Sequence, residues 1–260
     1  MKSRNEIKVS IITVTKNSEP FLAETIKSVI DQTYPLIEYI IIDGASTDNT
    51  LNIVKQFSFA ISNFLSEKDQ GMYDAINKGL KLATGDYILI LNSDDLLTEN
   101  DTIEKVVKEI GMNKLDYYHG NMIKSKDNMF KKVKLFPVTF KRLLLSGHGT
   151  FVPHPCFFIS KNQNEQLGGY DTKYRYAADF DYILRTLADN KCKGKYINLF
   201  ITEFRIHNKS ITASGKINEE RKKILEEHGY NRYSLLVRLY FYYTSWIYYK
   251  LINVFYKYKR

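Results

Sequence analysis

The chain has 260 residues, of which 44% are hydrophobic and 26% are charged, with a formal net charge of +9 and a pI near 9.2. This composition is that of a folded globular protein, and two cysteines far apart, Cys156 and Cys192, exclude a disulfide framework or a zinc site. The excess of positive charge predicts an anionic partner, which could be nucleic acid, an anionic membrane surface or a phosphorylated substrate. With no apolar signal region after Met1, we expect an intracellular protein.

The first half alternates between apolar strand patterns and helix patterns. Residues 9–14 and 38–42 are rich in β-branched and apolar side chains, and each predicts a central strand. Between them, residues 19–33 have the apolar spacing of a helix, and another helix pattern begins near Asn49. This order predicts an α/β fold with a doubly wound, mainly parallel sheet and helices on both faces.

Acidic side chains follow the predicted strands. Residues 87–91 form an apolar run that stops at Asp94 and Asp95, the second strand stops at Asp43, and Asp69 lies in a polar loop. Because ligands of open α/β sheets bind beyond the carboxyl ends of parallel strands, we expect these acids on one rim. The adjacent pair could hold a divalent cation or could cap the helix predicted for residues 98–110.

The middle of the chain is less regular. Residues 117–123 and 129–136 alternate like strands across a lysine-rich turn, which predicts a hairpin or an extension of the sheet. A short strand is expected at 156–159 and a longer one at 196–206. The helix between them begins near Asp179 and Asp181, where its dipole alone would favour acids.

The tail differs from the rest of the chain. From Tyr230 to Arg260 there is no Asp or Glu, but there are six Lys or Arg residues and nine of the twenty tyrosines. This pattern predicts a helical segment that either lies on an anionic membrane surface or packs through its aromatic face on protein. No nucleic-acid-binding module precedes the tail, so nucleic acid is not the expected partner.

Four motifs in order resemble those of the family 2 glycosyltransferases. They are residues 9–13, 38–48 (Glu-Tyr-Ile-Ile-Ile-Asp-Gly-Ala-Ser-Thr-Asp), 92–95 (Asn-Ser-Asp-Asp) and 178–181 (Ala-Asp-Phe-Asp), and the resemblance covers about the first 210 residues. It implies a nucleotide-sugar-binding fold of the GT-A type, a divalent cation (Mn or Mg), and usually an inverting transfer.

The resemblance also assigns roles to single residues. It implies that Asp95 binds the metal most directly and that Asp94 shares the metal or faces the ribose. For the donor, it places Asp43 on the nucleotide base, with uracil favoured, and Asp69 in a loop that borders the donor. Thr13 and Thr15 would form a polar lip beside the base.

On the acceptor side, Asp179 resembles the base that deprotonates the acceptor hydroxyl, with Asp181 in a supporting role or as the alternative base. His154 lies where similar sequences have a histidine in an acceptor-side loop, although a buried structural histidine is equally compatible with the sequence. His207 is a further candidate for a metal or phosphate contact, and a surface loop histidine is the simpler interpretation.

We therefore expect a GT-A domain at residues 1–215, with a donor half at about 1–115 and an acceptor half at about 116–215, and a helical tail at 216–260. The expected reaction moves a sugar from a nucleotide-diphosphate donor, preferably a UDP-sugar, to a glycan or lipid-linked acceptor. We expect it in cell-surface polysaccharide synthesis, at the inner face of the cell membrane. A sugar nucleotidyltransferase, which would normally carry a Gly-rich phosphate loop after its first strand, and a non-catalytic scaffold are the alternatives.

Overall fold

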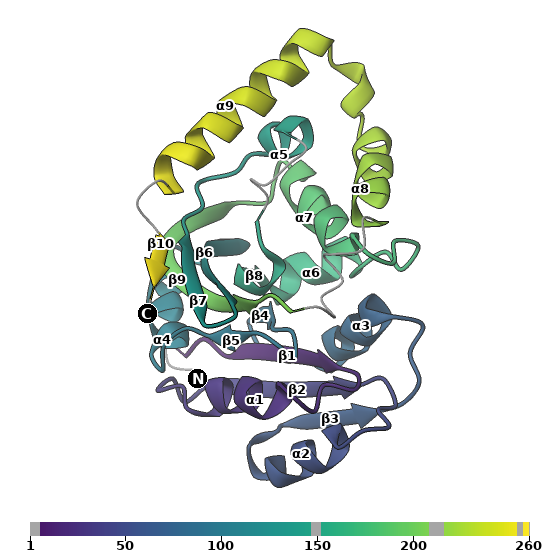
Figure 1. Cartoon of the computed structure of the whole chain (residues 1–260), viewed down its shortest axis with the longest axis vertical. Helices are drawn as coiled ribbons and strands as arrows, with labels where there is room; N and C mark the ends of the chain where they lie inside the picture. Colours follow the sequence, from purple (N-terminus) through teal and green to yellow (C-terminus); the bar gives the residue numbers. More distant parts are fainter. Residues whose placement is uncertain (1–5, 147–151, 208–215, 254–256, 260) are drawn as a thin grey trace.

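A mixed sheet runs through the centre of the molecule (Figure 1). The computed structural model describes residues 6–146, 152–207, 216–253 and 257–259. In this part of the chain the order of the strands is β10-β7-β6-β8-β4-β1-β2-β3, and β9 pairs with both β6 and β5. The strand bounds are β1 Val9–Thr15, β2 Ile37–Asp43, β3 Asn63–Ser66, β4 Tyr87–Ile90, β5 Leu96–Leu97, β6 Tyr117–Lys126, β7 Met129–Val133, β8 Phe157–Ser160, β9 Gly194–Arg205 and β10 Lys257–Lys259.

The N-terminal part of the sheet is built on parallel strands. β4, β1, β2 and β3 are neighbours in that order, and each pair among them is parallel. Successive side chains of these strands enter two different cores: Ile11 and Ile41 lie on one face, and Ile12 and Ile42 on the other. Both faces of the sheet are therefore buried, which explains why these strands are apolar runs and not alternating patterns.

The middle of the chain continues the same sheet with antiparallel strands. β8 pairs antiparallel with β4 and β6, and β6 pairs antiparallel with β7, so the predicted hairpin is confirmed. β9 returns parallel to β6 and reaches β5, which directly follows the acidic pair. The end of β9 is thereby brought beside Asp94 and Asp95.

Helices cover both faces of the sheet, as predicted. One core contains α1, α2 and α4, and the other contains α3, α5, α7 and α8. The fold is therefore of the α/β class. The bounds are α1 Leu22–Ile30, α2 Thr50–Gln56, η1 Ser58–Ala60, α3 Met72–Leu82, α4 Thr102–Asn113, α5 Phe140–Ser146, η2 His154–Cys156, α6 Lys161–Leu167, α7 Ala178–Ala188, α8 Lys216–Glu227, η4 Tyr230–Arg232 and α9 Leu235–Asn253.

The C-terminal segment is mainly helical. α8 contributes Ile224 and Leu225 to the core that contains α7, and α9 packs on α5. β10 adds an antiparallel edge strand to β7. Within the described ranges, no helix is both long enough and apolar enough to cross a bilayer. Whether residues 1–215 form a separate domain stays a prediction.

Candidate functional site

Asp43 ends β2 at the carboxyl edge of the parallel strands. Its carboxylate is fully buried and accepts hydrogen bonds from Ser46 N (3.0 Å), Ser46 Oγ (2.5 Å) and Ser66 Oγ (2.6 Å). A carboxylate has about four acceptor positions, so one is left on Oδ1. Asp43 therefore fixes the loops that follow β2 and β3, and it keeps one position for a further donor.

The two threonines of β1 have different environments. Thr13 is fully buried and accepts a hydrogen bond from the Tyr39 hydroxyl at 3.2 Å, so its hydroxyl is engaged in the core, and its place in a polar lip stays a prediction. Thr15 ends the strand beside Asp43. Its hydroxyl oxygen is buried and has no hydrogen-bond partner within the described ranges, so Thr15 keeps a free polar atom at the rim.

Asp69 lies against the loop that begins at Gly44. A Cβ atom added at Gly44 would stand 2.1 Å from Asp69 Oδ2, so any larger residue there would have to displace this carboxylate. Asp69 Oδ1 also accepts a hydrogen bond from Gly71 N at 3.0 Å. The structure thus brings Asp43, Asp69 and Thr15 together around Gly44, whose amide donates to Thr15 O.

The acidic pair after β4 is divided between the interior and the surface. Asp95 is fully buried, and its oxygens accept from Asn92 Nδ2 (2.8 Å) and Arg205 N (3.2 Å). Burial, followed by the charge of Asp94, raises the pKa of Asp95 well above its ordinary value. The Asp94 side chain is 25% exposed, and its Oδ2 lies 2.8 Å from His207 Nε2.

A divalent cation would fit best on the Asp94 side. Asp94 offers a carboxylate oxygen, the ligand type that suits Mg and Mn, and His207 from a distant segment is hydrogen-bonded to it. Among the described residues there is no cluster of three or more His, Cys, Asp or Glu side chains that could hold a metal. Such a cation would therefore need oxygens from a donor phosphate and from water, as Mg and Mn commonly do. Asp95 lies beside Asp94 but is fully buried, and the direct metal contact that the resemblance implies for it stays a prediction.

Asp179 occupies the first turn of α7 and is held by an aromatic hydroxyl. Tyr73, in the first turn of α3, donates its hydroxyl to Asp179 Oδ1 at 3.0 Å. Tyr73 follows the Asp69–Gly71 loop closely, so the rim that contains Asp69 and the carboxylate of Asp179 are connected through a few residues of chain. The hydrogen bond orients the carboxylate and leaves Oδ2 for another partner.

His154 lies under this carboxylate as a buried neutral side chain. Its Nε2 lies 2.5 Å from the Tyr170 hydroxyl, and Tyr170 stacks on both Tyr73 and Tyr182. Burial lowers the pKa of His154 to about 4, although the charge of Asp179 opposes the change. His154 therefore supports the aromatic stack, and an acceptor-side role for it stays a prediction.

Asp181 is held between two basic side chains. Its side chain is 6% exposed and accepts from Arg185 Nε at 2.7 Å, and its Oδ1 lies 2.9 Å from His228 Nε2. Burial raises the pKa of Asp181, but the hydrogen bonds from His228 and Arg185 outweigh it and lower the pKa below the ordinary value. Asp181 connects α7 to the end of α8, which agrees with a supporting role.

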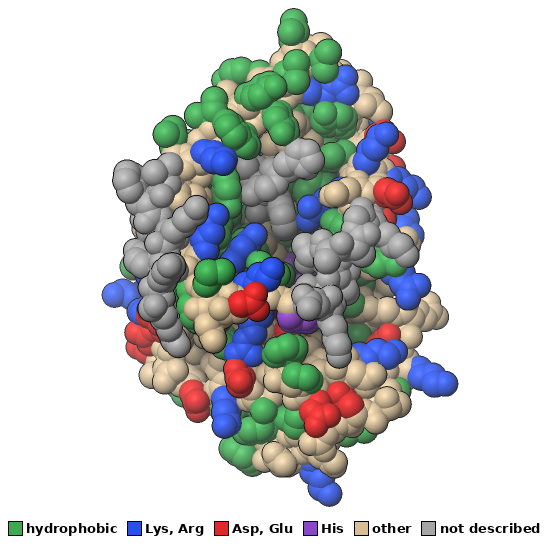
Figure 2. All heavy atoms as spheres, viewed as in Figure 1, with side chains coloured by type: hydrophobic (Ala, Val, Ile, Leu, Met, Phe, Trp, Pro, Cys, Tyr) green, Lys and Arg blue, Asp and Glu red, His purple; other side chains and the backbone are tan. Residues whose placement is uncertain are grey.

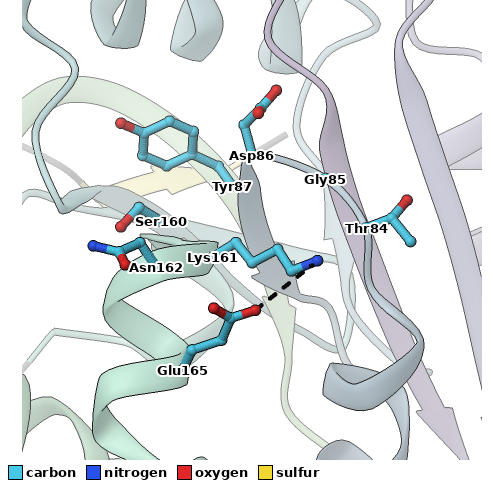
Figure 3. Close-up of a pocket in the computed structure, with 8 residues that line it drawn as sticks. All are labelled: Thr84, Gly85, Asp86, Tyr87, Ser160, Lys161, Asn162 and Glu165. Carbon is cyan, nitrogen blue, oxygen red and sulfur yellow. Dashed lines mark ion pairs between the residues drawn. The ribbon is translucent and has the colours of Figure 1, made fainter.

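A cavity of about 390 Å³ lies at the opposite edge of the sheet (Figure 3). It is lined by the turn that enters β4 and by the start of α6, including Tyr87, Lys161 and Glu165. Since Asp94 and Asp95 follow the other end of β4, this cavity is not part of the acidic rim. Near it, the buried carboxylate of Glu38 accepts hydrogen bonds from Lys8, Ser10 and Thr84.

Sequence reasoning missed three contributors to the site. Tyr73 carried a usable signal, because it directly follows the Gly-containing loop of Asp69. Arg205 contributes through its backbone amide, and Glu220 binds the chain before α7 from a distant helix. No local pattern could have indicated these last two contacts.

The sequence model described as "Glycosyl transferase family 2" matches residues 10–168. A "PGL/p-HBAD biosynthesis glycosyltransferase" of Mycobacterium bovis (strain BCG / Pasteur 1173P2) is 32% identical over 199 residues, which are 75% of this chain and 75% of that protein. An "uncharacterized glycosyltransferase" of Haemophilus influenzae is 38% identical over 116 residues, 44% of this chain and 46% of that protein.

Solved structures share the fold at low sequence identity. S. aureus TarS 1-349, solved in complex with UDP, has a TM-score of 0.65 and 19% identity over 84% of this chain. This chain spans 64% of that one, less than two thirds of its length. The mannosyltransferase PcManGT from Pyrobaculum calidifontis, solved with GDP-Man and Mn2+, has a TM-score of 0.66 and 18% identity, and the alignment covers 95% of this chain and 71% of that one.

Proposed function

Because the chain belongs to glycosyl transferase family 2, and is therefore a glycosyltransferase, we propose that it moves a sugar from a nucleotide-diphosphate sugar to an acceptor hydroxyl with inversion. The observation that carries the proposal is the shared rim. The ends of β2 and β4, the Asp69 loop and the first turn of α7 bring the donor-side acids and Asp179 to one edge of the sheet.

The donor would bind at the rim formed by Asp43, Thr15 and Asp69. The remaining acceptor position of Asp43 suits the N–H group of a uracil base, which favours a UDP-sugar. The TarS and PcManGT structures, with UDP and GDP-Man, support a nucleotide-sugar donor without deciding the base. Asp94 and His207 would hold a divalent cation, Mn or Mg, which when bound would neutralise the charge that develops on the leaving diphosphate.

Asp179 would act as the general base. Tyr73 fixes one carboxylate oxygen, and the other takes the proton of the acceptor hydroxyl as its oxygen attacks the anomeric carbon. The bond between that carbon and the diphosphate breaks at the same time, on the opposite face, so the configuration inverts. We place this transfer on a glycan or lipid-linked acceptor in cell-surface polysaccharide synthesis, at the inner face of the cell membrane.

A thermal-shift screen tests the donor part of the proposal. UDP-sugars and GDP-sugars, each with Mn and with EDTA, are compared for their effect on the melting temperature. A ligand that binds only the native state stabilises it by an amount that rises with the logarithm of its concentration relative to its Kd. Metal-dependent stabilisation by one donor is expected. If no nucleotide sugar stabilises the protein, the proposed donor site is wrong.

Transfer or slow hydrolysis of the stabilising donor then tests the base. The variant Asp179→Asn should keep the donor-induced shift and lose about 10²- to 10⁴-fold in rate. A variant that retains the full rate would remove Asp179 from the mechanism. A non-catalytic scaffold would bind donor and show no turnover in the wild type.

A further inference from the structure

The outward side of α9 is apolar along its whole length. The inner side of this helix packs on the core through side chains such as Val237 and Phe241. On the other side, large apolar residues recur every three or four positions, and we call them the outer face of α9: Leu236, Tyr240, Tyr243, Trp246, Ile247 and Leu251. Their exposed fractions range from 48% to 79%.

Such a helix is unusual on a protein surface. A helix that is apolar all round is normally buried on all sides, whereas α9 is covered on one side only in the described structure. Nine of the sixteen large apolar side chains that are exposed in the described residues belong to α9, and Figure 2 shows them gathered at one end of the molecule. Isolated exposed apolar residues need no explanation, but a continuous patch marks a binding surface.

The charges around the outer face have one sign. The chain contains no Asp or Glu from residue 128 to 164, which includes α5, and none from 228 to 260, which includes α9. Cations accompany α9 instead: Lys250 lies over Trp246 on the outer face itself, and Lys141 and Arg142 of α5 lie over Phe241 and Tyr248 where α9 meets α5. The partner should therefore present a negatively charged surface with an apolar layer beneath it.

We propose that the outer face of α9 rests on an anionic lipid bilayer. Tyr and Trp rings prefer the depth of the lipid headgroups, and Lys and Arg beside them contact lipid phosphates. A second copy of the chain fits less well, because a two-fold interface would place this patch against itself, bring Lys250 close to its own copy and supply no acidic residue from α9 to pair with it. This inference rests on the proposed function, because membrane binding would serve the transfer to a lipid-linked acceptor. The binding itself can be measured whether or not that transfer occurs.

Docking through α9 would orient the site. α9 packs on α5, and α5 packs on α7, whose first turn carries Asp179 (Figure 1). The donor half, with α1 and α2, lies at the far end of the molecule in this view. The acceptor side would therefore face the bilayer, where a lipid-linked acceptor is held, and the donor side would face the solvent.

The contact between α9 and lipid can be followed by tryptophan fluorescence. Trp246 is the single tryptophan, lies on the outer face and is 51% exposed. Full-length protein is mixed with vesicles of phosphatidylglycerol and phosphatidylcholine (1:1) or of phosphatidylcholine alone, and co-sedimentation and tryptophan emission are measured. With the anionic vesicles we expect co-sedimentation and emission at shorter wavelength, both weakened by high salt.

Variants separate the apolar and the charged contributions. Leu236→Glu and Tyr243→Glu place a charge on exposed positions and should abolish vesicle binding without unfolding the chain, which circular dichroism checks. Lys250→Gln should weaken binding about fivefold, the effect of one cation near an anionic surface. The matched control is Phe59→Glu, since Phe59 is 80% exposed in η1 of the donor half and should have no effect.

Two results would overturn the inference. One is wild-type protein that does not bind anionic vesicles, or that binds them as well when Leu236→Glu and Tyr243→Glu are present. The other is a blue shift of Trp246 that depends on protein concentration and not on lipid, together with a dimer in light scattering that either variant dissociates. Either result can occur with full transfer activity, so failure here is distinct from failure of the proposed reaction.

Discussion

Glu220 of α8 holds the chain that leads into the base-bearing helix. Its Oε1 accepts from Arg175 N at 2.8 Å, and its Oε2 accepts from Tyr176 N at 2.7 Å and Ala177 N at 2.9 Å. α7 begins at Ala178, and its N-cap residue Ala177 makes no side-chain cap. The Glu220 carboxylate of α8 therefore accepts hydrogen bonds from the amides that precede α7, the helix that carries Asp179.

The loss of this carboxylate has a calculable cost. A hydrogen bond to a half-exposed carboxylate contributes about 1 kcal/mol net, so Glu220→Ala, which removes three, should lower the free energy of unfolding by about 3 kcal/mol. Glu220→Gln keeps one oxygen and should cost about 1 kcal/mol. Displacement of Asp179 by a fraction of an ångström should lower kcat by roughly ten- to a hundredfold.

Three measurements check this reasoning. Urea denaturation gives the free energies, steady-state transfer gives kcat and KM, and thermal shift with nucleotide and Mn gives donor binding. Donor binding and the donor KM should not change, because Asp43 and Asp94 lie on other elements. The control is Glu219→Ala, the exposed neighbour in the same helix. Wild-type kcat in Glu220→Ala, or a loss of donor affinity equal to the loss of rate, would refute the positioning role.

Further predictions concern the cation, the base and the opposite edge of the sheet. Asp94→Asn should abolish the extra thermal stabilisation that Mn gives to the nucleotide complex, and EDTA should do the same to the wild type; a variant that still responds to Mn would contradict this. Tyr73→Phe removes the hydrogen bond to Asp179 and should reduce kcat about tenfold with the donor KM unchanged; a shift in donor KM alone would count against the proposed contact. At Glu38, burial raises the pKa, but hydrogen bonds from Lys8, Ser10 and Thr84 outweigh it and lower the pKa from 4.5 to about 2. Its stabilising effect is therefore complete above pH 4.5 and is lost as the pH falls toward 2. The free energies of unfolding of wild type and Glu38→Gln, measured by urea denaturation, should differ by about 2–3 kcal/mol at pH 7 and converge in acid.

The sequence was informative wherever one local pattern determined the structure. The parallel strands β1, β2 and β4 are apolar runs because both faces are buried, and the acids that follow them reach the same rim because parallel strands end on the same side. The hairpin of β6 and β7 followed from alternation and a polar turn. To predict these features, only the spacing of apolar residues, the turn residues and the direction of the strands were needed.

Other features depend on contacts that local patterns do not encode. Thr13 and Thr15 point to the same side of β1, yet Thr13 is bound by Tyr39 of the neighbouring strand and Thr15 ends at the rim. Asp94 and Asp95 are adjacent acids, but β9 buries the second and leaves the first beside His207. In both pairs, an element far away in the sequence determines which residue is engaged in the interior and which lies at the rim. The local motif was therefore compatible with either arrangement.

The C-terminal tail has features that its sequence shows and features that only its contacts show, and its two helices differ in role. Its lack of acids after Glu227 and its many aromatic residues are visible in the sequence, but the division of labour between its two helices is not. α8 turns inward, with Glu220 on the amides before α7 and His228, just beyond its end, on Asp181, whereas α9 turns its apolar side outward. Only η4 and a few residues separate the helix that positions the base from the helix that offers a lipid-binding face. A change in the packing of α9 on α5 would therefore reach Asp179 by two routes, through α5 to α7 and through α8 to the N-terminus of α7.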